Sequence, residues 1–166
     1  MRRRTKQINF LSGEVGKLLI KKKLTIAVAE SCTGGLLSSY MTDISGSSEY
    51  FILGIVAYSK SRKERVLKIP KAILEKYSSV SDKVSSLMAQ NVKRIAKTDI
   101  GIGITGYAGP AGGTAKDPKG TVYIAVAFGG KILVKRHLFK GTRVVVKRKA
   151  IKQALRLLYT SLRNAE

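Results

Sequence analysis

Residues 24–35 read LTIAVAESCTGG, and this stretch decides the fold class of the chain. Its apolar run at 24–29 is short and lies between three lysines and a polar segment, which is typical of a buried β-strand. Residues 36–41 have helical character. The stretch therefore predicts a strand, a glycine-containing turn and a helix in succession.

The rest of the chain continues this alternation. Residues 5–23 carry apolar side chains at helical spacing and end in lysines, as a helix C-terminus prefers. Ser81 is the expected N-cap of a long helix, and strands at 120–128 and 131–139 form a hairpin across Gly129 and Gly130. Further elements are expected as strands at 50–58 and 99–105, short helices at 61–67 and 71–77, and a C-terminal helix capped by Thr142. The order predicts one α/β domain over residues 1–166, with helices covering a mixed sheet.

The composition limits the classes of protein and of site. With 44% apolar residues the chain can bury a core, and no window approaches the roughly 18 apolar residues of a membrane span. The N-terminus lacks the apolar segment of a secretory signal, so we expect a cytoplasmic protein without membrane contact. Because the sequence has one cysteine, Cys32, and one histidine, His137, it excludes an internal disulfide, a cysteine-based zinc site and a two-histidine metal motif.

The chain is strongly basic. It has 32 Lys and Arg against 10 Asp and Glu, a net charge of +22, and residues 131–163 contain eleven basic side chains and no acidic one. This calls for an anionic partner, a phosphorylated ligand or weakly bound nucleic acid, although a solvated basic face has the same composition. Few aromatic residues and no RNA-binding signature weigh against a nucleic-acid-binding module.

Two polar, glycine-rich segments follow predicted strands, at residues 30–35 and 105–113. In α/β sheets, ligands bind beyond the carboxyl ends of parallel strands. If the strands at 24–29 and 99–105 are parallel, both segments meet at one edge and border the main pocket. The candidate substrate-binding residues in these segments are Glu30, Thr33, Gly34, Gly35, Thr105, Gly106, Gly109, Gly112 and Gly113.

Ser31 is the candidate nucleophile, because it precedes a helix start whose free backbone N–H groups favour a developing oxyanion. The alternative is that Ser31 or Thr33 only caps the helix. Cys32, without a histidine partner, is more often a small buried residue.

A serine nucleophile needs a base. His137 lies in a predicted strand and is interpreted as a half-exposed strand residue, so the candidates are Lys63 and Tyr58. A lysine that is desolvated or set among other cations has a lowered pKa and can accept a proton. The alternative is that these lysines are ordinary surface charges.

Together the segments resemble the C-terminal domain of the CinA family, the nicotinamide-nucleotide amidases. The resemblance covers about residues 10–160 and keeps the order and spacing of the motifs. These are AESCTGG at 29–35, ISGSS at 44–48, Tyr58-Ser59 with Lys63, Val80-Ser81, GITG at 103–106, AGP at 108–110, Gly112-Gly113, Pro118, GTV at 120–122, and Gly141 with Arg143 and Arg148.

The resemblance implies a three-layer α/β/α sandwich with a mixed β-sheet. It also implies hydrolysis of nicotinamide mononucleotide to nicotinate mononucleotide and ammonia, in pyridine-nucleotide salvage, without metal or cofactor. The family's serine nucleophile falls on Ser31, and its assisting tyrosine and lysine fall on Tyr58 and Lys63. Arg143, in the first turn of the last predicted helix, is the candidate for binding the substrate phosphate.

Four positions depart from the family pattern. Ala111 replaces an aspartate of the second glycine loop, Lys60 an asparagine, Asp82 a glutamate and Thr142 an acidic residue. Ala111 and Lys60 leave open a nucleotide-binding relative without catalysis, and the net charge of +22 leaves open a nucleic-acid-binding module that uses the basic surface. A homo-oligomer is expected only from the general frequency of such assemblies.

Overall fold

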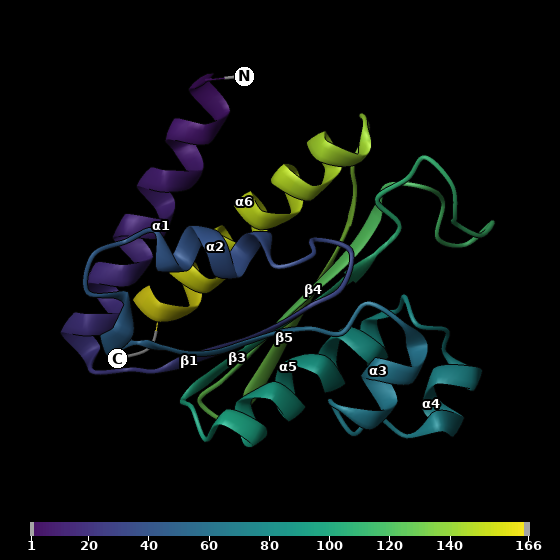
Figure 1. Cartoon of the computed structure of the whole chain (residues 1–166), viewed down its shortest axis with the longest axis horizontal. Coiled ribbons are helices and arrows are strands. Elements are labelled where there is room, and N and C mark those ends of the chain that lie inside the picture. Colours follow the sequence, from purple (N-terminus) through teal and green to yellow (C-terminus); the bar gives the residue numbers. More distant parts are fainter. Residues whose placement is uncertain (1, 165–166) are drawn as a thin grey trace.

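A five-stranded mixed sheet forms the centre of the molecule (Figure 1). The computed structural model describes residues 2–164, with side chains from Lys6 onward. The strand order is β2-β1-β3-β4-β5. β1 (Ile26–Glu30) runs parallel to β2 (Phe51–Val56) and to β3 (Ile100–Gly106). β4 (Thr121–Phe128) and β5 (Lys131–Leu138) add an antiparallel hairpin. The predicted class, hairpin and parallel first and third strands are confirmed.

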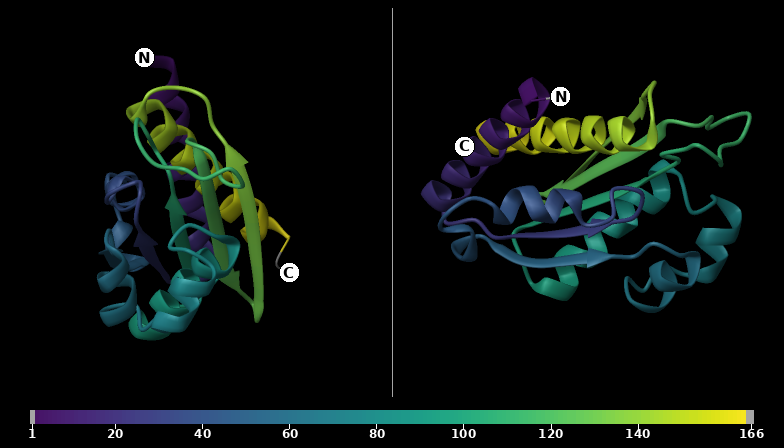
Figure 2. Two further views of the ribbon diagram at one scale, coloured as in Figure 1. Left: turned by 90° about the vertical axis from the view of Figure 1, so that its right-hand side faces the viewer. Right: turned by 45° about the horizontal axis from the view of Figure 1, so that its top comes forward.

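Helices cover both faces of the sheet (Figure 2). On one face lie α1 (Arg2–Lys22), α2 (Leu36–Thr42) and α6 (Arg143–Arg163). The other face carries α3 (Lys60–Arg65), α4 (Lys71–Lys76) and α5 (Asp82–Ala96), and a single 3₁₀ turn, η1 (Ser47–Glu49), precedes β2. Each layer has its own apolar cluster, the first including Val15, Leu19, Met41, Leu155 and Leu158, the second Ala27, Ala29, Val84, Met88 and Val92. The arrangement is the three-layer α/β/α sandwich that was expected.

The alternation of isoleucine and glycine in β3 allows α5 to lie directly on the sheet. A Cβ atom at Gly101 would come within 2.0 Å of the Ala89 carbonyl oxygen, and one at Gly103 within 2.2 Å of the Ser85 carbonyl oxygen. Only glycine fits at these two positions. The close approach fixes α5, and with it the segment before α5, relative to the carboxyl end of β3.

The helix ends agree with the sequence in part. Ser81 is the N-cap of α5, and its hydroxyl accepts a hydrogen bond from the Val84 amide at 3.2 Å, as predicted. Thr142 occupies the N-cap position of α6, but its side chain makes no capping hydrogen bond, so the predicted capping role is wrong. Within the described residues, no helix is both long and apolar enough to cross a membrane.

Candidate active site

The two glycine-rich segments meet at the carboxyl edge of the parallel strands, as predicted. The Ser31 amide, just after β1, donates a 3.0 Å hydrogen bond to the Ile104 carbonyl of β3. A pocket of about 240 Å³ opens at this edge. The residues that line it are Ser31, Cys32, Tyr58, Lys63, Ser79, Val80, Gly106, Tyr107, Ala108, Ala111 and Arg143.

A buried serine and a buried lysine are in direct contact in this pocket. The Lys63 ammonium, which α3 supplies, donates to Ser31 Oγ at 2.9 Å. Lys63 is only 2% exposed and Ser31 6%. The N-cap position of α2 is Gly35, with no capping side chain, so neither Ser31 nor Thr33 serves as the cap that was the alternative interpretation. The Ser31 hydroxyl instead accepts the hydrogen bond from Lys63.

The surroundings of Lys63 favour its neutral form. Burial lowers the pKa of its amine from 10.5 to about 8, because the charged form loses its hydration. Within the described residues Lys63 has no ion-pair partner that would restore the charge. About a tenth of the molecules would then carry a free amine at pH 7, and about half at pH 8. A free amine at 2.9 Å can accept the serine proton.

Cys32 lines the same pocket but is unsuited to be the nucleophile. Burial raises the pKa of its thiol to about 12, so the thiol stays protonated near neutrality. The alternative interpretation, a small buried residue, agrees with its 6% exposure.

Glu30 is fully buried and uses its carboxylate to cap α2. Its Oε2 accepts from the Leu37 amide at 3.1 Å, and its Oε1 accepts from the amide and the hydroxyl of Ser38, both at 2.8 Å. A carboxylate at a helix N-terminus is also favoured by the helix dipole. Glu30 therefore holds the start of α2, and through it the turn that carries Ser31, and it does not line the pocket.

Replacement of Glu30 by alanine is expected to destabilise the fold by about 2–4 kcal/mol, because buried donors lose a charged acceptor. Urea unfolding of the variant measures this loss. Ser39→Ala, which changes an exposed hydroxyl on the same helix, is the control and should change the free energy of unfolding little. Equal stability of the two variants would show that the carboxylate does not hold α2.

Arg143 and Tyr58 form the rim of the pocket. Arg143, in the first turn of α6, donates Nη1 to the Gly109 carbonyl at 2.8 Å and Nη2 to the Tyr58 hydroxyl in a short hydrogen bond. Tyr58 is 58% exposed, and the next residue, Ser59, is the N-cap of α3, the helix that carries Lys63. Lys147, one turn further along α6, places its Nζ 3.5 Å from where a Cβ on Gly34 would lie. Arg143 thus places a cation at the rim of the pocket, and Lys147 lies beside Gly34, outside the lining.

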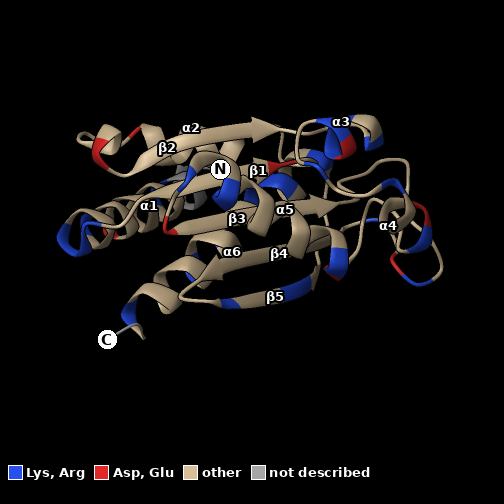
Figure 3. Cartoon of the chain, turned by 90° about the horizontal axis from the view of Figure 1, so that it is seen from below, with Lys and Arg blue, Asp and Glu red and all other residues tan. Residues whose placement is uncertain are grey.

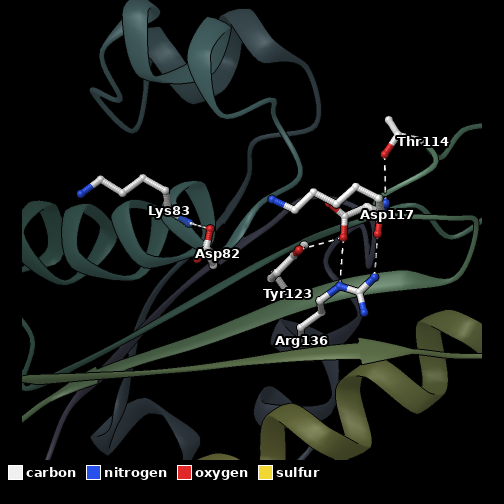
Figure 4. A network of polar contacts seen from close by, with 7 residues as sticks. Asp82, Lys83, Thr114, Asp117, Tyr123 and Arg136 are labelled. Carbon is white, nitrogen blue, oxygen red and sulfur yellow. Dashed lines mark hydrogen bonds and ion pairs between the residues drawn. The ribbon is translucent and has the colours of Figure 1, made fainter.

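The long loop between β3 and β4 is anchored by a polar network at its far end (Figure 4). Asp117 accepts hydrogen bonds from the Tyr123 hydroxyl at 2.8 Å and from Arg136 Nε at 3.0 Å. Its amide donates to Thr114 Oγ1 at 2.9 Å. Asp117 is 7% exposed, whereas the Arg136 side chain is 43% exposed, so the network ties the loop to β4 and β5 at the edge of the buried interior.

Five of the predicted site residues line the pocket: Ser31, Tyr58, Lys63, Gly106 and Arg143. Gly109 contributes a carbonyl to Arg143, and Thr105 donates to the Ser79 carbonyl at 2.8 Å. The predicted residues outside the lining are Glu30, Thr33, Gly34, Gly35, Thr105, Gly109, Gly112 and Gly113. His137 lies on β5, stacked on Phe139 with ring centroids 5.2 Å apart, which agrees with its interpretation as a strand residue.

The pocket also contains residues that were not predicted. Ser79 and Val80 come from the segment before α5. Because this segment follows a helix, the expectation that ligands bind at the carboxyl ends of strands did not include them. Tyr107 and Ala108 directly follow Gly106, and their position in that loop was the available signal. Ala111 also lines the pocket and supplies only a methyl group there. Over the part of the chain that the structure describes, no group of three His, Cys, Asp or Glu could hold a metal ion.

Other proteins share the sequence and the fold of this chain. A family model described as the CinA C-terminal domain matches residues 8–162. A CinA-like protein of Syntrophus aciditrophicus is 46% identical over 149 residues, which is 89% of this chain and 36% of that protein. A CinA-like protein of Desulforapulum autotrophicum is 48% identical over 126 residues, 76% of this chain and 30% of that protein. The chain spans about a third of the length of the curated relatives it matches.

The fold also has a solved counterpart. The crystal structure of the competence damage-inducible protein A from Klebsiella pneumoniae superposes with a TM-score of 0.93 at 33% sequence identity. The match covers 96% of this chain and 99% of that chain.

Proposed function

This chain belongs to the CinA C-terminal domain family, and on that premise we propose that it is an amidase that converts nicotinamide mononucleotide to nicotinate mononucleotide and ammonia. The observation that carries the proposal is the 2.9 Å contact between Lys63 Nζ and Ser31 Oγ inside a pocket. A serine beside a lysine whose pKa is lowered to about 8 is an activated nucleophile with its own base.

In the first step, neutral Lys63 takes the Ser31 hydroxyl proton while Ser31 Oγ attacks the carboxamide carbon. The carbonyl oxygen then carries the negative charge of the tetrahedral intermediate. The amides of Cys32 and Thr33 are its proposed donors, because neither makes a backbone hydrogen bond within the described residues and both follow the nucleophile. The Lys63 ammonium next protonates the amide nitrogen, the C–N bond breaks, and ammonia leaves an ester on Ser31.

In the second step, water hydrolyses that ester. Neutral Lys63 accepts the proton of the attacking water, and the second tetrahedral intermediate expels Ser31 Oγ. The lysine returns its proton to the serine, and nicotinate mononucleotide leaves with its carboxylate. Because the 2.9 Å contact is direct, this route does not require Tyr58 to relay the proton. The tyrosine's role is to orient Arg143 at the rim.

The dimensions and charges of the site fit a phosphorylated substrate with a small aromatic amide. A volume of about 240 Å³ is below that of most ligand sites, so it would accept the ring and its amide and leave the sugar phosphate at the mouth. Arg143 lines the pocket and lies in the first turn of α6, where the helix dipole also favours an anion.

Ammonia release from nicotinamide mononucleotide by the purified chain tests the proposal. We expect stoichiometric formation of ammonia and nicotinate mononucleotide, with the unphosphorylated nucleoside as a poorer substrate. If neither compound is deamidated by folded protein across pH 6 to 9, the amidase proposal is wrong and the pocket only binds its ligand.

Replacement of Arg143 by alanine is expected to raise KM for the mononucleotide about ten- to hundredfold, because a charged hydrogen bond to the phosphate is lost. The effect on kcat should be much smaller, since the phosphate contact is the same in the ground state and the transition state. For the unphosphorylated nucleoside, KM should hardly change. An equal loss for both substrates would mean that Arg143 only positions the loop and Tyr58.

A further inference from the structure

A second and larger hollow lies between α1 and α6, two helices that are in contact on the same face of the sheet (Figure 1). It has a volume of about 820 Å³, and an adjoining hollow of about 330 Å³ shares Gln7, Lys152 and Arg156 with it. The two form one groove, and none of its lining residues belongs to the catalytic pocket.

The described residues that line the groove include basic side chains and no acidic one. Its charged lining residues are Lys6, Arg148, Lys149, Lys152 and Arg156. Lys149 Nζ donates to the Lys140 carbonyl, and Lys152 Nζ donates across the groove to Gln7 Oε1. Among the described residues, Arg148 and Arg156 form no ion pair or hydrogen bond, so their guanidinium groups can bind an anion.

The groove also offers aromatic surface. Phe10 borders the smaller hollow and is 68% exposed, which is an unusual degree of exposure for a phenylalanine. Phe139 lines the larger hollow, and its ring stacks on the nearly parallel ring of His137. A row of cations with aromatic rings at both ends is the arrangement by which proteins bind single strands, since phosphates contact the cations and bases stack on the rings.

We propose that the α1–α6 groove binds single-stranded nucleic acid. Basic residues are spread over the whole chain and acidic ones are few, so charge alone would attract any polyanion (Figure 3). Three properties occur together in the groove: it is concave, its described lining residues include no carboxylate, and an exposed phenylalanine borders it. An acidic peptide would use the cations but would gain little from Phe10, whereas every base has a face that stacks on it.

The test is binding of a fluorescein-labelled 15-nucleotide oligothymidylate to the full chain, measured by anisotropy from 50 to 200 mM salt. In Arg148→Ala/Arg156→Ala, the affinity should fall at least tenfold at low salt, and the slope of log K against log salt should become shallower by about 1.4. The matched control is Arg94→Ala/Lys131→Ala, which removes two exposed charges outside the groove and should weaken binding by less than about threefold. Phe10→Leu should weaken binding about fivefold without changing the slope.

Ser31→Ala should bind the oligonucleotide as the unaltered chain does, so this result does not depend on the amidase. Equal losses in the two double variants would overturn the proposal in favour of general electrostatic attraction. A 15-residue polyglutamate that competes as well as the oligonucleotide, with no effect of Phe10→Leu, would assign the groove to acidic peptides. If the unaltered chain sediments as a dimer and Arg148→Ala/Arg156→Ala sediments as a monomer, the groove is instead a contact between two copies of this chain.

Discussion

Ser31→Ala is expected to lower the rate of ammonia release by about four orders of magnitude or more, because the hydroxyl that contacts Lys63 and attacks the carboxamide is lost. The neighbouring thiol stays protonated, with a pKa raised to about 12 by burial. The fold should be retained, since Glu30 and not Ser31 caps α2. Initial rates with nicotinamide mononucleotide, together with the thermal midpoint of the same preparation, measure both effects.

Cys32→Ala is the matched control for this variant. It removes a side chain of similar size from the adjacent position, and any loss should come from packing and stay within a few-fold. A folded Ser31→Ala protein that turns over at near-normal rate would exclude the serine as nucleophile. If Cys32→Ala were then the inactive variant, the assignment would pass to the thiol.

The fold could be predicted from the sequence because its strongest signals are local. The apolar run at 24–29, the isoleucine–glycine alternation at 100–104 and the Gly129-Gly130 hairpin each indicate one element. The parallel pairing of β1 with β3 follows from the helices between strands. Thr142 shows the limit of such reasoning, because its position was right while the orientation of its hydroxyl depends on the packing of α6.

Strand ends predict only part of the site, and the need for a base, the family resemblance and the start of the last helix predict Lys63, Tyr58 and Arg143. Ser31 and Gly106 lie at the carboxyl ends of β1 and β3, so topology brings them together. The contact between Lys63 and Ser31 joins residues 32 positions apart, and no periodicity in the sequence shows that α3 directs this lysine inward. For the same reason, the position of Glu30 beside the serine does not show that its carboxylate turns back onto α2.

Lys63→Met is expected to abolish ammonia release as fully as Ser31→Ala does, because the base that accepts the serine proton is removed. In the unaltered chain the rate should rise tenfold per pH unit below about pH 8 and level off above it, as Lys63 loses its proton. Lys63→Arg should also be inactive, since an arginine keeps its proton throughout this range. Rates of the three proteins between pH 6 and 10 test this.

Lys63→Met should also make the fold more stable at neutral pH. The unfolded chain keeps the Lys63 proton up to a pKa of 10.5 and the folded chain only up to about 8, so between these values the unfolded state binds more protons and the free energy of unfolding rises with pH. Below pH 8 the buried charge costs on the order of 3 kcal/mol, and loss of the Ser31 hydrogen bond offsets about 1 kcal/mol of the gain. Met keeps the apolar stem, so urea unfolding at pH 7 should show Lys63→Met more stable by about 2 kcal/mol, with the difference shrinking toward pH 10.5. A variant that is inactive and also less stable at pH 7 would mean that Lys63 supports the fold rather than the chemistry.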